Sequence, residues 1–384
     1  MELSADQQNA ISTLIMWFKD SQKSPYITLG GYAGTGKTTV ISLFRNELNS
    51  LNKNISVAFC SYTGKAARVL SNRLKDNNSV FQNDTISTIH SLIYSPMVDD
   101  SSNEIVGWEK KKTLNANLIV VDEASMVDEQ IWRDLLYYRI PIIAVGDHGQ
   151  LPPIGSKFNL MEKPNLKLEQ IHRQAEGNPI IELSILARTK GEISTGKFGT
   201  NIKKFLRNDF DASESITELL QNYREDTTIL CGFNTTRVKL NKYVRGALGF
   251  ENPMPEARDR VICLKNNSKK SIFNGMLGKV LFTNDLDELF LEAGIQMDYE
   301  TDYYFGTLLK EQFNSKETLI KLARKEVDLF DFGYALTVHK SQGSQSKRVI
   351  LFEERAQSMD DDMWKRWLYT AVTRAEEELF VIGK

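Results

Sequence analysis

Four glycines, a lysine and three threonines near the amino terminus have the types and spacing that hold phosphate groups. The stretch LGGYAGTGKTTVISLF, residues 29–44, contains the pattern G-x-x-x-x-G-K-[ST]. Glycines let backbone N–H groups turn toward phosphate oxygens, and the helix that follows adds partial positive charge. Lys37 is expected to reach the β- and γ-phosphates, and Thr38 to ligate magnesium. The predicted nucleotide-binding residues here are Gly31, Gly34, Thr35, Gly36, Lys37, Thr38 and Thr39.

Two acidic residues follow a second apolar segment and supply the chemistry of hydrolysis. In LIVVDEAS, Asp122 and Glu123 come directly after four apolar residues that predict a buried strand. Asp122 is expected to bind Mg²⁺ together with Thr38, and Glu123 to polarise the water that attacks the γ-phosphate. Gln150, in VGDHGQLPPIG, is a candidate sensor of that phosphate. An isolated Asp-Glu pair is commonly a helix cap, but after a phosphate-binding loop it favours hydrolysis of a nucleoside triphosphate.

These residues need a parallel sheet that brings the ends of several strands to one edge. Residues 1–90 alternate short apolar strands with helical patterns, as in YITLGG, TTVISLFRNELNS and ISVAFCSYT. A strand–helix unit returns in TTILCGFNTTRVKLNKYVRGAL and again near the carboxyl end. The prediction is an α/β protein with two parallel-sheet domains, residues 1–170 and 171–384. A hairpin insert is expected at 90–116 and a small β-rich insert at 264–326.

The motifs occur in an order that resembles the superfamily 1 helicases, specifically the 1B branch of RecD-like and phage Dda-like enzymes. They are LSADQQNAI, GYAGTGKTT, SYTGKAARVL, TISTIHSLI, VVDEASMVD, GDHGQLPP, LEQIHRQ, ALTVHKSQGSQ and LYTAVTRA. Each is weak alone, but the series covers nearly the whole chain. The resemblance implies two RecA-like domains that bind ATP, with an SH3-like fold for the β-rich insert.

The resemblance also implies roles for residues outside the phosphate-binding loop. Gln7 corresponds to the glutamine that reads adenine, and Gln342 and Gly343 lie in a motif that bridges nucleotide and strand sites. Arg173 and Arg374 correspond to arginines that stabilise charge during phosphoryl transfer. The alternative for either arginine is a solvated surface charge. His148 and His172 lack metal-ligand spacing and are expected to be structural.

Contacts to a DNA strand are expected from segments that resemble motifs Ia, Ib and V and from the hairpin. A motor that tracks along one strand needs backbone contacts that ignore sequence. The predicted DNA-binding residues are Tyr62, Thr63, Lys65, Thr88, His90, Tyr94, Trp108, Thr337 and His339. Helix capping or turn packing is the alternative for the threonines and histidines. The family usually has Ala-Pro where this chain has Ser61 and Tyr62, and Tyr62 is therefore a candidate stacking platform.

The hairpin at about residues 91–110 corresponds to an insert that separates strands in the family. Tyr94, Met97 and Trp108 are candidates for stacking on the junction base pair, and the acidic tip, Asp99 and Asp100, for repelling phosphate. The alternative is that these side chains pack against the sheet domain.

Composition narrows the class of protein. The formal net charge is −2, so any nucleic-acid contact must be a local groove. Three widely separated cysteines suggest neither zinc nor a disulfide framework, and the amino-terminal segment resembles neither signal peptide nor membrane span. We expect a cytoplasmic monomer whose partners are single-stranded DNA, duplex junctions and DNA-binding or replication proteins. A 5′→3′ polarity is implied only by the resemblance. A 3′→5′ translocase, an RNA-stimulated remodelling ATPase and a nucleotide-controlled switch remain alternatives.

Overall fold

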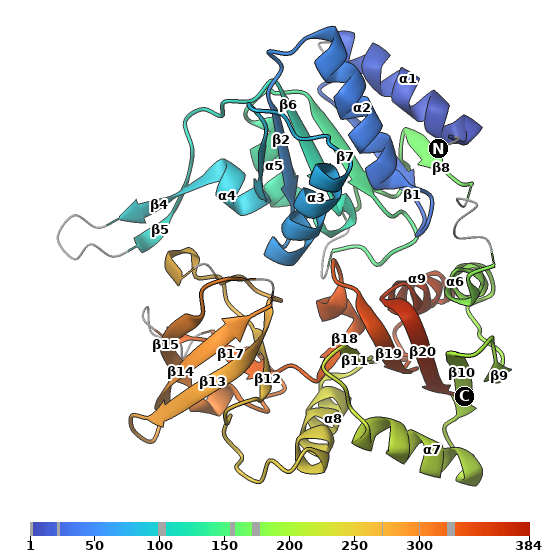
Figure 1. Cartoon of the computed structure of the whole chain (residues 1–384), viewed down its shortest axis with the longest axis vertical. Helices are drawn as coiled ribbons and strands as arrows, with labels where there is room; N and C mark the ends of the chain where they lie inside the picture. Colours follow the sequence, from blue (N-terminus) through green and yellow to red (C-terminus); the bar gives the residue numbers. More distant parts are fainter. Residues whose placement is uncertain are drawn as a thin grey trace. The chain divides into compact units, whose positions relative to one another are not determined.

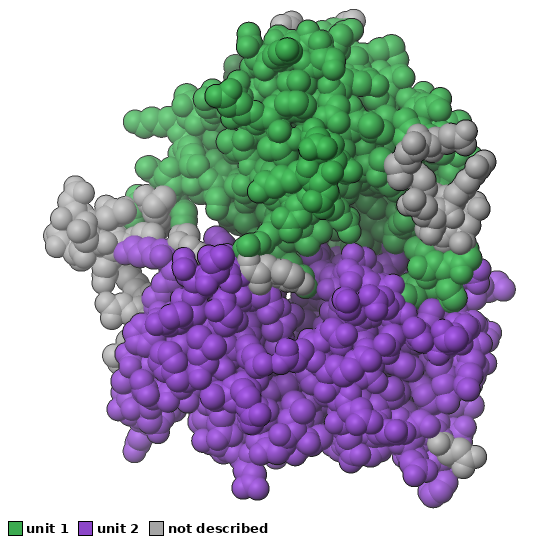
Figure 2. Space-filling view, in the orientation of Figure 1, with its two compact units in different colours: residues 1–181 green, residues 182–384 purple. Residues whose placement is uncertain are grey.

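The protein has two compact units, Met1–Ile181 and Glu182–Lys384 (Figure 2). The computed structural model describes residues 3–20, 24–98, 105–153, 158–170, 177–270, 272–298, 300–320 and 327–384. Both units are built on a largely parallel sheet with helices on its faces, which confirms the predicted α/β class (Figure 1).

The sheet of the first unit has six strands in the order β3-β2-β6-β7-β1-β8, and its neighbouring strands run parallel. Their bounds are β1 Tyr26–Gly31, β2 Val57–Ser61, β3 Thr85–Thr88, β6 Leu118–Asp122, β7 Ile142–Gly146 and β8 Leu166–Leu168. Because all six run in one direction, the loops that follow β1, β2, β3, β6 and β7 gather at one edge of the sheet.

Helices cover both faces of this sheet. They are α1 Ala5–Lys19, α2 Lys37–Leu51, α3 Gly64–Asp76, α4 Ile89–Ile93 and α5 Glu129–Leu136, with a 3-10 turn at Ala124–Met126. Side chains of β2 alternate between two cores. Val57 and Phe59 join the core under α1, α2 and α3, whereas Ala58 and Cys60 join the core under α4 and α5. This alternation explains why each strand reads as a continuous apolar run.

An antiparallel hairpin follows α4. Its strands are β4 Tyr94–Val98 and β5 Ile105–Lys110, which pair from Tyr94 opposite Lys110 to Val98 opposite Ile105. Figure 1 shows the hairpin extending away from the sheet of the first unit. The chain then returns to the sheet at β6.

The second unit has a six-stranded sheet in the order β18-β11-β19-β20-β10-β9, in which only the pairing of β9 with β10 is antiparallel. Its strands are β9 Gly196–Lys197, β10 Ile202–Leu206, β11 Thr227–Cys231, β18 Ala335–Thr337, β19 Ser346–Phe352 and β20 Ala375–Gly383. Its helices are α6 Pro179–Lys190, α7 Phe210–Gln221, α8 Asn234–Ala247 and α9 Asp361–Val372, with a 3-10 turn, η5, at Val338–Ser341.

A third sheet lies within the second unit and shares one apolar core with α7, α8 and the parallel sheet. Its order is β16-β15-β14-β13-β12-β17, and only β15 and β16 pair in parallel. The strands are β12 Arg260–Cys263, β13 Leu277–Asp285, β14 Phe290–Met297, β15 Tyr304–Leu309, β16 Val327–Asp328 and β17 Phe330–Phe332, with 3-10 turns at Ser268–Lys270 and Lys310–Gln312. Among the described residues, no helix is both long and apolar enough to cross a membrane.

A buried ion pair anchors the outer strands of the first sheet. Arg45 on α2 donates two hydrogen bonds to Asp84, at 2.9 and 3.0 Å, and both side chains are almost fully buried. Asp84 also accepts from the backbone N–H groups of Val57 and Phe81. This carboxylate therefore connects a helix to the starts of β2 and β3.

Replacing Asp84 with alanine should lower the free energy of unfolding by about 3–5 kcal/mol, because it leaves the Arg45 charge buried and unpaired. Urea unfolding followed by circular dichroism measures the change. Arg133→Ala is the matched control, since Arg133 pairs with Glu129 on the surface and should cost about 0.5 kcal/mol or less. Equal effects of the two substitutions would contradict the anchoring role of Asp84.

Candidate functional site

The phosphate-binding loop connects β1 to α2 in the conformation that its glycines permit. Gly34 and Gly36 have φ values of 80° and 78°, in the left-handed region that favours glycine. A Cβ atom at position 36 would lie 2.5 Å from Gln7 Nε2. Lys37 Nζ donates to the carbonyl oxygens of Gly31 and Tyr32 at 2.7 and 3.0 Å. The ammonium group therefore lies against the loop that a phosphate would enter.

Gln7 is buried directly beside this loop. Its Nε2 donates to Thr35 O at 3.0 Å, and its Oε1 accepts from Ser4 N at 3.0 Å in the capping box of α1. Both polar ends of the amide are thus engaged within the protein. The first turn of α1 supports the backbone of the phosphate-binding loop, a contact that the sequence pattern did not predict.

Asp122 and Glu123 lie at the carboxyl end of β6. Burial, together with the charge of Glu123, raises the pKa of Asp122 to about 6, although Lys37 and Arg73 oppose the increase. Glu123 has a φ of 53°, a left-handed conformation that is uncommon for a residue with a side chain. The chain therefore turns sharply at Glu123, the residue predicted to polarise the attacking water.

The oxygen groups near this edge suit magnesium. The carboxylates of Asp122 and Glu123 and the hydroxyl of Thr38 are hard oxygen donors, and Mg²⁺ is commonly held by one or two carboxylates and by phosphate oxygens. Among the described residues, no group of three His, Cys, Asp or Glu side chains forms a metal site without added ligands.

The loop after β7 packs onto the phosphate-binding loop. The His148 ring lies 4.1 Å from the Tyr32 ring, centroid to centroid. Asp147 Oδ1 accepts from Gly149 N at 2.9 Å, and Gln150 Nε2 donates to Asp147 Oδ2 at 3.3 Å. Gln150 and Asp147 are buried, so hydrogen bonds within the loop itself stabilise its conformation. His148 is structural in this setting, as the sequence suggested.

The residues expected to contact DNA in the first unit gather at the ends of β2 and β3. Tyr62, His90 and Tyr94 form a row of rings, with centroids 6.1 Å apart for Tyr62 and His90 and 5.8 Å apart for His90 and Tyr94. Burial lowers the pKa of His90, despite the nearby charge of Asp128, so a neutral imidazole is favoured at pH 7. Lys65 lies half-buried in the first turn of α3.

Thr63 and Thr88 both act as helix caps. The Thr63 hydroxyl accepts from Ala66 N at the start of α3, and the Thr88 hydroxyl accepts from Ser91 N at the start of α4. This is the capping role that the sequence left open as an alternative. Capping aligns two helix N-termini at the same edge of the sheet as the nucleotide residues, and such termini favour phosphate.

The hairpin candidates differ in their surroundings. Tyr94 donates to Asp134 Oδ2 at 2.6 Å, which attaches the base of the hairpin to α5. Burial and this hydrogen bond raise the pKa of Tyr94. Met97 and Trp108 are 44% and 48% exposed, so they remain available to a ligand. The tip residues Asp99 and Asp100 lie outside the described residues.

In the second unit, the predicted residues follow β18 and α9. Thr337 ends β18, while His339 and Gln342 lie in and after η5, and Gly343 has a φ of 72°. Burial lowers the pKa of His339, and it lowers the pKa of Lys340 to about 8. An anion bound beside Lys340 would favour the charged ammonium group and raise this pKa.

Arg374 is held inside the second unit. Its guanidinium donates to Thr370 O at 3.0 Å, Ser344 O at 3.0 Å and the Thr373 hydroxyl at 3.3 Å, and the residue is only 4% exposed. These contacts connect the turn after α9 to the segment after η5. Arg173 and His172 lie outside the described residues.

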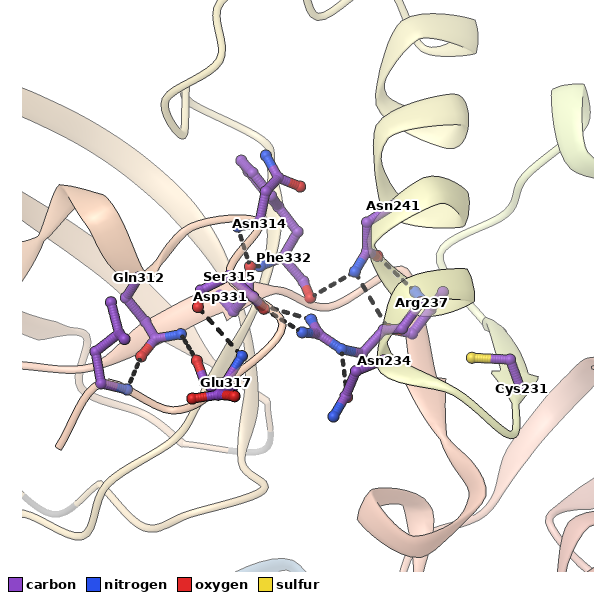
Figure 3. Close-up of polar contacts among 12 residues, drawn as sticks. Cys231, Asn234, Arg237, Asn241, Gln312, Asn314, Ser315, Glu317, Asp331 and Phe332 are labelled. Carbon is purple, nitrogen blue, oxygen red and sulfur yellow. Dashed lines mark hydrogen bonds and ion pairs between the residues drawn. The ribbon is translucent and has the colours of Figure 1, made fainter. Parts of the chain in front are cut away.

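A polar network near η5 was not predicted from the sequence (Figure 3). Arg237 on α8 donates to Asp331 Oδ2 at 2.5 Å, Ser315 O at 2.6 Å and Asn234 Oδ1 at 3.2 Å. Asn241 Nδ2 donates to Phe332 O and Ala335 O, and Asn241 Oδ1 accepts from Ala335 N. The network joins α8, the third sheet and the start of β18. The one feature of the sequence that could have indicated this network is the recurrence of polar residues at helical spacing in NTTRVKLN.

The first turn of α8 adds residues that the motif analysis missed. Phe233 precedes the helix and is 40% exposed, and its side chain makes no capping hydrogen bond. Cys231, two residues earlier, pairs with Thr337 on β18. The exposed start of α8 and the predicted Thr337 therefore lie at the ends of adjacent strands.

Comparisons with known proteins agree with this arrangement. Residues 16–156 match an AAA domain family, and residues 332–382 match the UvrD-like helicase C-terminal domain. The chain is 22% identical to the ATP-dependent DNA helicase dda of Enterobacteria phage T4, over 99% of each chain. The chain belongs to the superfamily 1B helicases.

Other relatives of this superfamily 1B chain differ in length. It is 28% identical to the ATP-dependent RecD2 DNA helicase of Deinococcus radiodurans over 93% of its own length and 47% of that relative. It spans less than half of the first curated relatives that it matches. The Pif1 helicase from Bacteroides, solved with ADP-AlF3 and single-stranded DNA, has a TM-score of 0.53 and 17% identity, covering 99% of this chain and 92% of that one. That likeness shows a shared fold.

Asp122→Asn should stabilise the ligand-free protein at about pH 8 by roughly 2–3 kcal/mol and have little effect below about pH 4. The folded pKa of Asp122 lies above its ordinary value, so the cost of its charge to folding grows as pH rises from the ordinary pKa, about 4, to the folded pKa of about 6. Thermal unfolding at the two pH values, without nucleotide or Mg²⁺, measures the change. The exposed Glu162→Gln is the control, and a pH-independent effect of Asp122→Asn would contradict the assignment.

Proposed function

We propose that this protein is an ATP-driven DNA helicase that translocates 5′→3′ on single-stranded DNA and unwinds the duplex ahead of it. The observation that carries the proposal is the proximity of the two sites within the first unit. Ser61 pairs with Asp122 on the adjacent strand, and the Ser61 hydroxyl donates to Asp122 O at 3.3 Å. A change at the nucleotide carboxylate therefore reaches the strand-binding loop through one pair of neighbouring strands.

The proposed chemistry assigns a role in ATP hydrolysis to each of the predicted nucleotide-site residues. Lys37 and the N–H groups of the loop bind the phosphates, and Asp122 and Thr38 hold Mg²⁺, which neutralises charge on the phosphates when bound. Glu123 orients and polarises water, and Gln150 senses the γ-phosphate. Arg374, together with Arg173, stabilises charge that develops during transfer.

The proposed contacts to the DNA strand bind its phosphate groups and stack on its bases without depending on the base sequence. The capped starts of α3 and α4 and the side chain of Lys65 contact phosphate groups, and Tyr62 and His90 offer rings for stacking. Thr337 and His339 supply contacts from the second unit. The hairpin then separates the strands, with Met97 and Trp108 against the junction and Tyr94 at its base.

Partial duplexes with either a 5′ or a 3′ single-stranded tail test the function. The protein should unwind the 5′-tailed duplex in the presence of ATP and Mg²⁺, and Lys37→Ala should remove both unwinding and ATP hydrolysis while circular dichroism stays unchanged. Unwinding of only the 3′-tailed duplex would reverse the polarity. Stronger stimulation by RNA than by DNA would favour the remodelling ATPase, and hydrolysis indifferent to both would favour the switch.

Arg374→Lys should reduce DNA-stimulated ATP turnover by about 10³-fold with little change in ATP affinity, because a lysine lacks the forked donors that contact several oxygens at once. Turnover and nucleotide binding are measured separately under saturating DNA. Arg374→Ala also leaves the carbonyl groups of Thr370 and Ser344 without this donor, so it should lower the melting temperature further. Normal turnover in a folded Arg374→Lys protein would remove Arg374 from the chemistry.

A further inference from the structure

A cavity in the first unit lies apart from every residue assigned above. It has a volume of about 540 Å³ and is formed between the segment that follows β5 and the connection from α5 to β7. This size suits a nucleotide unit, since pockets for small ligands have volumes of about 300–1,000 Å³. Its walls include Lys112, Leu114, Tyr137, Tyr138 and Arg139.

The cavity has a positive charge. Lys112 and Arg139 are exposed, and none of the described residues that line the cavity is acidic. Lys110 lies at its rim, with Nζ 4.7 Å from the centroid of the Tyr137 ring and 3.1 Å from Asp134 Oδ1. Burial would raise the pKa of Asp134, but hydrogen bonds from Tyr94, Lys110 and Gln130 lower it, so this charge is already compensated. The exposed Glu109 on β5 is the nearest opposing charge along the chain.

An aromatic platform adjoins these cations. Tyr137 is 60% exposed and packs edge-on against Tyr138, with ring centroids 5.4 Å apart. The Tyr138 hydroxyl donates to Ile93 O at 2.7 Å, which fixes the supporting ring. An exposed ring on a fixed support beside two cations can stack a base while its phosphates meet lysine and arginine.

The position of the cavity separates it from the tracking-strand residues. Thr63, Thr88 and His90 follow the carboxyl ends of β2 and β3, whereas Leu114 and Ile140 precede the amino ends of β6 and β7. Between β5 and β6 the chain must pass from one edge of the sheet to the other. Lys111 N donates to Ile93 O, so this passage starts at the base of the hairpin.

We propose that this cavity binds the displaced strand of the duplex after the hairpin has separated it. The proposal rests on the proposed helicase function and extends it. Lys112 and Arg139 contact phosphate groups, and Tyr137 stacks on an unpaired base. Binding at this site opposes reannealing behind the hairpin.

The backbone conformation of Arg139 allows its charge to be removed without disturbing the turn. Its φ is 53°, in the left-handed region, where glycine is less strained. Arg139→Gly therefore removes the charge without harming the turn. Arg258, with a φ of 81° and an exposed position in the second unit, provides a matched control as Arg258→Gly. Tyr137→Ala removes the platform, and Tyr137→Phe keeps it.

The experiment uses the full chain and a forked duplex with a 5′ tail for loading and a 3′ tail on the displaced strand. A 4-thiothymidine placed one to six nucleotides into the displaced tail should crosslink at or beside Tyr137. Tyr137→Ala should weaken the added affinity that the displaced tail provides by about tenfold, and Tyr137→Phe should not. Arg139→Gly should reduce the salt dependence of that added affinity by about 0.7 in log–log slope, and Arg258→Gly should leave it unchanged.

The outcomes separate this site from the proposed function. All variants should keep the ATPase activity that a tracking strand alone stimulates. If the wild-type protein unwinds 5′-tailed duplexes but the displaced strand crosslinks elsewhere, or all variants bind forks normally, the cavity assignment is wrong and the helicase function stands. If the crosslink forms at Tyr137 but no duplex is unwound, the helicase function is wrong and the strand-binding site stands.

Discussion

The parallel pairing of the first sheet is the constraint on which the site depends. Parallel strands place all their carboxyl ends at one edge, so loops distant in sequence become neighbours. Gly30 on β1 pairs with Gly146 on β7, and Ser61 on β2 pairs with Asp122 on β6. A one-residue shift of β2 against β6 would turn the Ser61 side chain to the opposite face of the sheet. The loop between β1 and α2, the Asp122 carboxylate and the loops that we propose contact the DNA strand are adjacent for this reason.

Buried polar contacts hold that edge in one conformation. The Gln7 amide supports Thr35 and the His148 ring packs on Tyr32 at that edge, and Asp84 fixes the starts of β2 and β3 at the opposite edge of the sheet. A buried polar group that loses its partner costs free energy in the low-dielectric interior, so these contacts favour a single arrangement of the loops. Burial also raises the pKa of Asp122 to about 6, which a divalent cation would offset. The Asp122 carboxylate thus holds its charge at a cost that a bound cation would lower.

Three cationic side chains of the second unit are buried or half-buried. The Arg374 guanidinium is hydrogen-bonded to backbone carbonyl groups, the Arg237 guanidinium is paired with Asp331, and burial lowers the pKa of Lys340. A phosphate that reached Arg374 would exchange carbonyl partners for charged oxygens, which form stronger hydrogen bonds. This exchange would change the turn after α9 and the segment after η5 together, because Arg374 joins them. The hydrogen bonds of this one side chain therefore join two segments of the second unit.

The sequence by itself determined the α/β class, the phosphate-binding loop, the carboxylates after β6 and the family, because each depends on local periodicity or on a short motif whose geometry its own residues set. Strand-forming apolar runs predicted β1, β2 and β6, and the glycine spacing predicted the loop in which Gly34 and Gly36 have left-handed φ values. Only the tertiary structure decided which residues meet across the chain. The attachment of Tyr94 to Asp134, the contact of Arg374 with Ser344 and the cavity beside Tyr137 all depend on contacts between distant segments. No local pattern encodes such contacts, since packing and desolvation are set by neighbours that the fold alone brings together.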